Sequence, residues 1–160
     1  MKIKNGEKLP DAKVFIFDKD PKETSIKQII GDDRVIIFGI PGAFTPTCST
    51  KHLPGFMASD NLLSKKNIKK VICISVNDPF VMNAWGNVHN VQDKIIMLAD
   101  SKGDFTRRIG VQKDLSHRGL GLRSGRYTML VEEGLIKKIS EEEIPGKCEV
   151  TAAANFLREI

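Results

Sequence analysis

The sequence has little of what several protein classes require. Its 160 residues include only three cysteines, an odd and sparse set that makes a poor disulfide framework and favours a reducing compartment. The longest nearly uncharged apolar run, Val35 to Phe44, has ten residues, whereas a membrane span needs about 20. The first ten residues lack the apolar core of a signal peptide. We therefore expect a soluble, cytoplasmic protein that does not engage a membrane.

Charge and composition are typical of one ordinary globular domain. Lys and Arg number 25 against 20 Asp and Glu, which gives a net charge of +5. The densest basic stretch, Lys65 to Lys70, has almost no aromatic side chains nearby, so it indicates a solvated helix end rather than a nucleic-acid site. No repeat or Ser/Gly linker divides the chain. Residues 1–160 are therefore expected to form a single domain.

Apolar runs and capping residues predict alternating strands and helices. The expected strands are Lys13–Phe17, Arg34–Ile40, Val71–Val76, Ile95–Leu98, Arg126–Val131 and Leu135–Ser140. The expected helices are Pro46–Lys66 with a bend or break at Pro54 and Gly55, Pro79–Val88 capped by Asp78, Phe105–Ile109, and a last helix capped by Thr151 that runs through Leu157. Strands separated by helices imply an α/β three-layer α/β/α sandwich, whose central sheet is mixed because the late hairpin adds antiparallel strands at one side.

The helix Pro79–Val88 has an apolar stripe of its own. Phe80, Ala84 and Val88 recur at a spacing of four residues and share one side of the predicted helix.

A reactive cysteine is predicted directly after the second expected strand. If Thr45 caps the next helix, Pro46 takes its first position and Cys48 its third, among amide hydrogens that have no partner within the helix. A thiol with the ordinary pKa of about 8.5 is only ~3% ionised at pH 7, and a helix end contributes at most about 2 kcal/mol toward the anion. A cation must supply the rest. Arg126 is the first candidate and Arg123 the second.

Several other interpretations of the same residues stay open. Cys48 could be a buried small apolar residue, and Arg126 an exposed cation at a strand end. His52 lies four residues after Cys48 on the same helical face, which would suit a cysteine hydrolase, although a supporting or surface imidazole is the more common case. The chain has no C-x-x-C dithiol, no phosphate-binding loop and no paired zinc-ligand spacing, so we expect no metal site.

Four segments resemble a known family. They are PGAFTPTCSTKHLPGF (41–56), CISVNDPFVMNAWG (73–86), ADSKGDFTRRIG (99–110) and GLGLRSGRYTMLVEEG (119–134). Together they resemble a peroxiredoxin of the peroxiredoxin-5 group, which includes the plant type II enzymes. The resemblance implies a thioredoxin-like fold and an enzyme that reduces hydrogen peroxide and alkyl hydroperoxides without metal, haem or flavin.

The resemblance also implies roles for individual residues. Cys48 matches the peroxidatic cysteine, which becomes a sulfenic acid, and Thr45 matches the hydroxyl that binds the peroxide. Pro41 matches the residue that shields the thiolate from water, and Arg126 the one that holds the sulfur and the peroxide oxygens. Gly125 stands where many relatives have a lysine.

The thiol that reduces the sulfenic acid is less well defined. The resemblance favours glutathione and glutaredoxin, with thioredoxin as the other candidate, and implies a homodimer. Cys73 lies within the apolar run VICISV and is expected to be a core residue rather than a resolving cysteine. Cys148 lies where animal-type relatives carry a resolving cysteine, but its surroundings do not match residue for residue. The alternative function is a redox-sensing or chaperone-like binding module whose cysteine is oxidised without sustained turnover.

Overall fold

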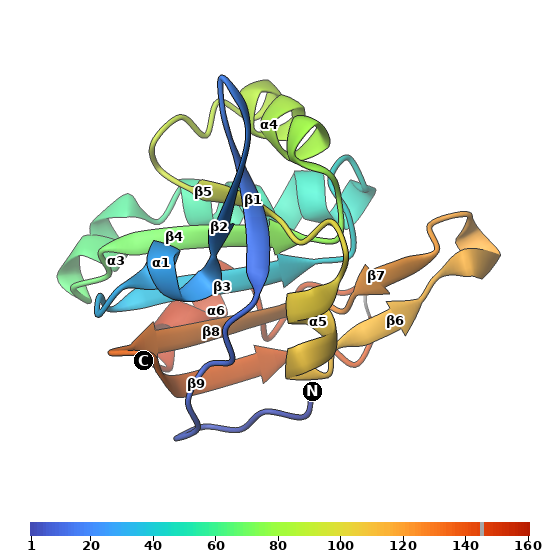
Figure 1. Ribbon diagram of the computed structural model, residues 1–160. Helices are drawn as coiled ribbons and strands as arrows, with labels where there is room; N and C mark the ends of the chain where they lie inside the picture. The colour runs from blue at the N-terminus through green and yellow to red at the C-terminus, as the bar shows by residue number, and fades with distance from the viewer. Residues whose placement is uncertain (145) are drawn as a thin grey trace.

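The computed structural model describes residues 1–144 and 146–160 and is organised around one seven-stranded sheet. The strand order is β2-β1-β5-β4-β3-β8-β9. Its strands are β1 (Lys13–Asp18), β2 (Asp20–Ser25), β3 (Val35–Ile40), β4 (Lys70–Ser75), β5 (Ile96–Ala99), β8 (Tyr127–Glu132) and β9 (Leu135–Glu141). Two short strands, β6 (Gln112–Asp114) and β7 (Leu122–Ser124), form a separate ribbon that projects from one end of the sheet (Figure 1).

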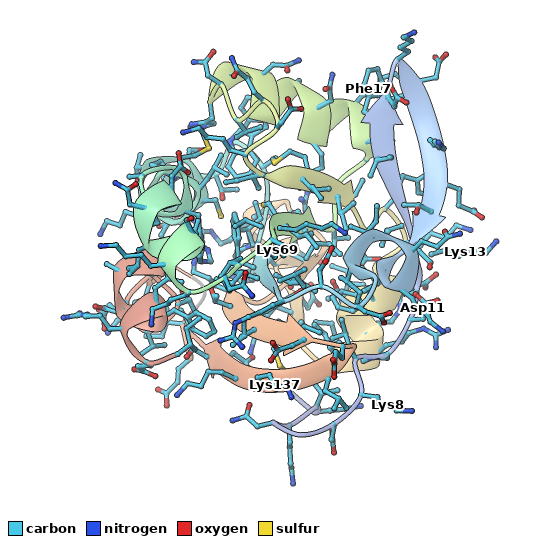
Figure 2. All side chains as sticks on the ribbon, turned by 90° about the vertical axis from the view of Figure 1, so that its left-hand side faces the viewer. Lys8, Asp11, Lys13, Phe17, Lys69 and Lys137 are labelled. Carbon is cyan, nitrogen blue, oxygen red and sulfur yellow. The ribbon has the colours of Figure 1, made fainter. Side chains whose placement is uncertain are left out.

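The sheet is mixed, as the sequence predicts. Strands β3, β4 and β5 are parallel neighbours, whereas β8 pairs antiparallel with both β3 and β9. The sequence did not predict β2, because its six residues DPKETS are polar and none of them is buried. It pairs with β1 as a hairpin that turns at Lys19 and extends past the sheet beside α4 (Figure 1). Figure 2 shows Phe17 near the tip of this hairpin, where its ring lies 5.3 Å from that of Phe80.

Helices cover both faces of the sheet and complete the predicted three layers. One face carries η1 (Cys48–His52), α2 (Leu53–Met57), α3 (Asp60–Lys65), α4 (Pro79–Val88) and α6 (Ala153–Arg158), and the other carries α1 (Ile26–Ile30) and α5 (Asp104–Ile109). A 3-10 turn, η2 (Ser116–Arg118), joins the two strands of the ribbon. All six residues of β3 are buried, which confirms a strand covered on both sides. Alternate residues of β3 enter separate cores: Phe38 packs under the first set of helices, and Ile37 under the second.

The helix after the cysteine loop is not broken at Pro54 and Gly55, the two residues predicted to bend or break it. Helical backbone begins at Pro46 and continues through both residues to Met57, and α3 starts after a turn at Ala58 and Ser59. The reason lies in η1, a π-helical turn in which the Leu53 amide donates to the Cys48 carbonyl five residues back. This wider turn immediately precedes Pro54, where a regular helix would need the amide hydrogen that proline lacks.

The sequence predicts side-chain caps at Asp78 for α4 and at Thr151 for the last helix. The first forms and the second does not. Helix α4 has the predicted bounds, and the Asp78 carboxylate accepts from the Val81 amide, as expected of its cap. Thr151 does not cap α6, which begins at Ala153, because its hydroxyl and its amide both donate to Glu142.

The apolar stripe of α4 faces outward. Phe80 and Val88 are exposed, while Met82 and Trp85 fill the core. The buried side of the helix is therefore the one that carries the larger side chains of Met82 and Trp85. No helix in the described part of the chain has the length and apolar character needed to cross a membrane.

Candidate active site

The predicted reactive cysteine lies where the central strand β3 gives way to a helix. A short loop of residues 41–45 leads from Ile40 to the helix that begins at Pro46. The first bond within that helix runs from the Ser49 amide to the Thr45 carbonyl over 3.1 Å. The amides of Thr47 and Cys48 therefore precede the hydrogen-bonded part of the helix, as the sequence predicts. The Cys48 side chain is completely buried.

Arg126 reaches the sulfur of Cys48. Its Nη2 donates to Cys48 Sγ over 3.3 Å, and the arginine is only 1% exposed. Sheet topology explains this contact between residues that are 78 positions apart. Because β8 runs antiparallel to β3, with Tyr127 opposite Gly39, Arg126 directly before β8 lies beside the end of β3, where the loop of residues 41–45 begins.

His52 supports the arginine instead of acting on the cysteine. Arg126 Nη1 lies 3.1 Å from His52 Nδ1, and an arginine can only donate, so Nδ1 carries the lone pair. The other ring nitrogen then holds the hydrogen and faces the Thr151 carbonyl at 3.1 Å and the Thr128 hydroxyl at 3.2 Å. Burial, together with the charge of Arg126, lowers the pKa of His52 to about 3, so the ring is neutral. Both nitrogens are engaged, and the structure therefore does not support a Cys48–His52 base pair of the hydrolase type.

Glu142, whose carboxylate is buried, links Arg126 to the segment that follows β9. Glu142 donates its amide hydrogen to the Arg126 carbonyl over 2.9 Å, and its Oε1 accepts from the amides of Glu149 and Thr151 at 2.6 and 3.0 Å. Burial alone would raise the pKa of Glu142, but these amides, the Thr151 hydroxyl and the charge of Arg126 together lower it. The carboxylate thus fastens the segment after β9 over the site. That segment also meets the cysteine helix, since the Thr47 hydroxyl donates to the Gly146 carbonyl over 2.9 Å.

The remaining predicted residues lie in the loop itself. Pro41 is buried directly after β3, and Thr45 is half-buried. The Thr45 hydroxyl donates to the Gly42 carbonyl over 2.7 Å, which folds the loop into a tight turn. Asn77, which follows β4, fixes this turn by accepting from the Ala43 amide over 3.0 Å. The loop therefore brings Pro41, Thr45 and Cys48 to the carboxyl end of the parallel strands, the place where open α/β sheets bind ligands.

Electrostatically, the site is a thiol and a guanidinium in a shared buried environment. Within residues 1–144 and 146–160, no three His, Cys, Asp or Glu side chains are grouped so that they could hold a metal ion. The arrangement can stabilise a thiolate, and it can stabilise negative charge on an oxygen that approaches the sulfur.

Known proteins of one family are similar to this chain over most of its length. The Redoxin family model matches residues 4–157. Peroxiredoxin-2D of Arabidopsis thaliana is 39% identical over 155 residues, which cover 96% of this chain and 95% of that protein. The chloroplastic Peroxiredoxin-2E of the same plant is 42% identical over 146 residues and is longer, so that the match covers 88% of this chain but 62% of that protein.

Solved structures extend the likeness to three dimensions. Peroxiredoxin 5 from Alvinella pompejana is similar with a TM-score of 0.86 and 32% identity, covering 98% of this chain and 96% of that one. The chain belongs to the peroxiredoxins, in the peroxiredoxin-5 group. The reduced Prx3 of Vibrio vulnificus in complex with H₂O₂ is also similar to this peroxiredoxin, with a TM-score of 0.91, 35% identity and 98% coverage of both chains. The thioredoxin-like fold expected from the resemblance is confirmed.

The other two cysteines of the peroxiredoxin lie in different environments. Cys73 is fully buried in β4, and burial, with a smaller contribution from Cys48, raises its pKa well above the ordinary value. It is a core residue, as its apolar neighbours predict. Cys148 is half-exposed in the segment that Glu142 fastens, with its sulfur 3.9 Å from the Thr151 hydroxyl, and burial raises its pKa as well.

Sequence reasoning missed two residues that position the site. Asn77 could have been found, because an amide side chain directly after a parallel strand lies at the edge where the cysteine loop was expected. Glu142 gave no such signal. It is one acidic residue in the run Glu141 to Glu143, and only the fold shows which of the three is buried against Arg126.

Proposed function

We propose that this peroxiredoxin reduces hydrogen peroxide and alkyl hydroperoxides through a sulfenic acid on Cys48. The observation that carries the proposal is the 3.3 Å contact from Arg126 Nη2 to Cys48 Sγ in a site closed to bulk water. A guanidinium keeps its charge when buried, so it stabilises the thiolate, the form of cysteine that attacks peroxides. The similarity to a Vibrio vulnificus protein that binds H₂O₂ supports the same substrate class.

The reaction balances as a two-electron oxidation of sulfur. The Cys48 thiolate attacks one peroxide oxygen, so that an S–O bond forms while the O–O bond breaks. The departing oxygen takes up a proton and leaves as water or an alcohol. Arg126 faces the reacting sulfur and is placed to stabilise the negative charge that develops on that oxygen. One thiol then converts the sulfenic acid to a mixed disulfide with loss of water, and a second thiol releases Cys48.

Thr45 and Pro41 have supporting roles in this proposal. The Thr45 hydroxyl now donates to a backbone carbonyl in its own loop, and a bound peroxide could accept that hydrogen bond in place of the Gly42 carbonyl. Pro41 is buried beside the site and offers no amide hydrogen to water, which keeps the thiolate poorly solvated.

Replacing the cysteine tests the proposal. Cys48→Ser should abolish the consumption of tert-butyl hydroperoxide, measured with glutathione and glutaredoxin as the reducing system. Cys73→Ser is the matched control, since it removes a thiol from the same core without touching Arg126. If Cys48→Ser kept most of the activity, the proposal would be refuted. A wild-type protein that stopped after one equivalent of peroxide would instead be a redox sensor.

We propose glutathione, delivered directly or through glutaredoxin, as the reductant. The similarity to plant type II relatives supports this choice, and so does the burial of Cys73, which leaves that thiol inaccessible as an internal partner. Mass spectrometry after one equivalent of peroxide tests it. A glutathione adduct on Cys48 is expected, whereas a disulfide with Cys148 would identify an internal resolving cysteine. Such a reductant implies a reducing compartment, and we place the protein in the cytoplasm.

We further propose that the protein acts as a homodimer. Phe44 and Phe80 are 55% and 59% exposed, which is unusual for large aromatic side chains. They follow β3 and β4, which are adjacent parallel strands, so both side chains belong to the edge of the sheet that carries the site. A second copy of the chain would cover this apolar edge.

A further inference from the structure

A second arginine lies over the cysteine loop. Arg123 belongs to β7, in the ribbon that projects from the end of the sheet (Figure 1). Its Nη1 is 3.1 Å from the point that a Cβ on Gly42 would occupy, and the Thr45 methyl group is 3.2 Å from the same point. The guanidinium therefore lies beside Thr45, and it can do so because residue 42 has no side chain.

The Arg123 guanidinium has hydrogen-bonding capacity to spare. Among the described residues its one hydrogen bond runs from Nε to the Leu120 carbonyl over 2.8 Å, which fixes the direction of the side chain. The side chain is only half-exposed, and none of the salt bridges formed by the described residues includes it. Its two terminal nitrogens form the planar fork that matches a carboxylate.

The strand partner of Arg123 adds to the positive charge. Lys113 stands directly opposite it in the β6–β7 pair, an arrangement of like charges that weakens a strand pair by itself. Arg126 lies three residues further along the chain and donates to Cys48 Sγ, so two arginines approach the segment that carries the thiol. A site of this kind attracts anions.

We propose that Arg123 is a specificity residue that binds a carboxylate on the molecule reacting at Cys48. The inference rests on the proposed peroxidase function and adds the chemical class of the ligand. A carboxylate could reach Arg123 from either reactant, since an organic hydroperoxide can be an acid and glutathione carries two carboxylates. The competing explanation is purely structural: the guanidinium packs on the loop and holds Thr45 in place.

Two matched pairs of reactants separate these cases. For the oxidative half of the cycle, kcat/KM is compared for cumene hydroperoxide and its para-carboxylate derivative. For the reductive half, it is compared for glutathione and glutathione diethyl ester. Arg123→Met should lower the ratio of charged to neutral reactant about tenfold in at least one half, as expected for the loss of one charge-assisted hydrogen bond in a partly exposed site. The half in which the ratio falls identifies the source of the carboxylate.

The controls distinguish binding from packing. Arg123→Lys keeps the charge and should keep part of the selectivity, and added salt should reduce the wild-type ratio. Arg118→Met removes the same charge from an exposed position of the ribbon and should leave both ratios as they are. If Arg123→Met lowered the rates for charged and neutral reactants alike, or left both ratios unchanged, the inference would be overturned. Failure of the wild-type protein to consume cumene hydroperoxide would instead contradict the peroxidase function itself.

Discussion

The pairing of His52 with Arg126 decides the chemistry of the site at the scale of single residues. A protonated imidazole could not accept a hydrogen bond from a guanidinium, so the 3.1 Å contact requires His52 to be neutral. The aromatic rings of Phe38 and Phe56 pack against the imidazole, with centroids at 4.8 and 5.8 Å, and exclude water from it. A neutral acceptor at this position orients Arg126 toward Cys48 without competing for its charge.

The neutral histidine should make the protein less stable at mildly acidic pH. In the unfolded chain His52 binds a proton at its ordinary pKa near 6.5, whereas in the folded protein its pKa is about 3. Because the unfolded state binds more protons between these values, the free energy of unfolding should fall as the pH drops below 6.5. The expected loss is about 2 kcal/mol by pH 5, measured by urea denaturation.

Two variants isolate this contribution. His52→Asn retains an oxygen that can accept from Arg126 but cannot titrate, so it should flatten the pH dependence even if it lowers stability at pH 7. His117→Asn changes an exposed imidazole and should keep the slope of the parent protein. An unaltered slope in His52→Asn would show that other groups cause the acid sensitivity.

At the scale of elements, the antiparallel pairing of β3 and β8 places the proposed catalytic groups. The Tyr127 ring packs directly on Gly39, and a Cβ built on that glycine would overlap Tyr127 Cε1. The close approach lets Arg126, directly before β8, lie beside the cysteine loop. The adjoining π turn has a comparable role, because it carries Cys48 at its first position and His52 at its last and so keeps both near the arginine.

Closing the space between these strands should cost stability. Gly39→Ala must displace the buried Tyr127 ring, and we expect the free energy of unfolding to fall by about 3 kcal/mol. Since Tyr127 adjoins Arg126, the rate of peroxide reduction should fall too. Gly146→Ala is a suitable control, because a Cβ there meets no atom within 4 Å. A Gly39→Ala protein within about 0.5 kcal/mol of the parent would contradict the close approach.

At the scale of the whole molecule, one edge of the sheet carries both the chemistry and the exposed aromatic side chains. The outward-facing stripe on α4 adds to this surface, since Phe80 and Val88 are exposed and do not belong to the core. Phe80 also packs on Phe17 of the β1–β2 hairpin, so the aromatic surface spans two elements.

A charge placed in this surface should separate the proposed dimer. Phe80→Glu is expected to sediment as a monomer at micromolar concentration, where the parent protein sediments as a dimer. Ile144→Glu is the control, since it puts the same charge on an equally exposed apolar residue, 56% exposed, in the segment after β9. Equal sedimentation of parent and Phe80→Glu would show that the aromatic edge is not the dimer interface.

Local patterns in the sequence determined most of the elements and the place of Cys48 at the start of a helix. The uninterrupted apolar run of β3, the Asp78 cap of α4 and the sequence Thr45-Pro46 before Cys48 act through neighbours a few residues away, and the structure bears out each of these elements. Patterns of this kind failed where a neighbour overrode them. The π turn carried the helix past Pro54 without a break.

The sequence offered Arg126 as the first candidate for the cation beside the thiol, and only the tertiary structure decided that it lies there. Arg126 is 78 positions from Cys48, and its contact depends on β8 pairing antiparallel with β3 in a defined register. The protonation of His52 and the burial of Glu142 follow from that same packing, because each depends on how the arginine is held. A sequence specifies such contacts through the sum of many weak interactions across the sheet, so the partners of His52 and Glu142 could be read only from the folded chain.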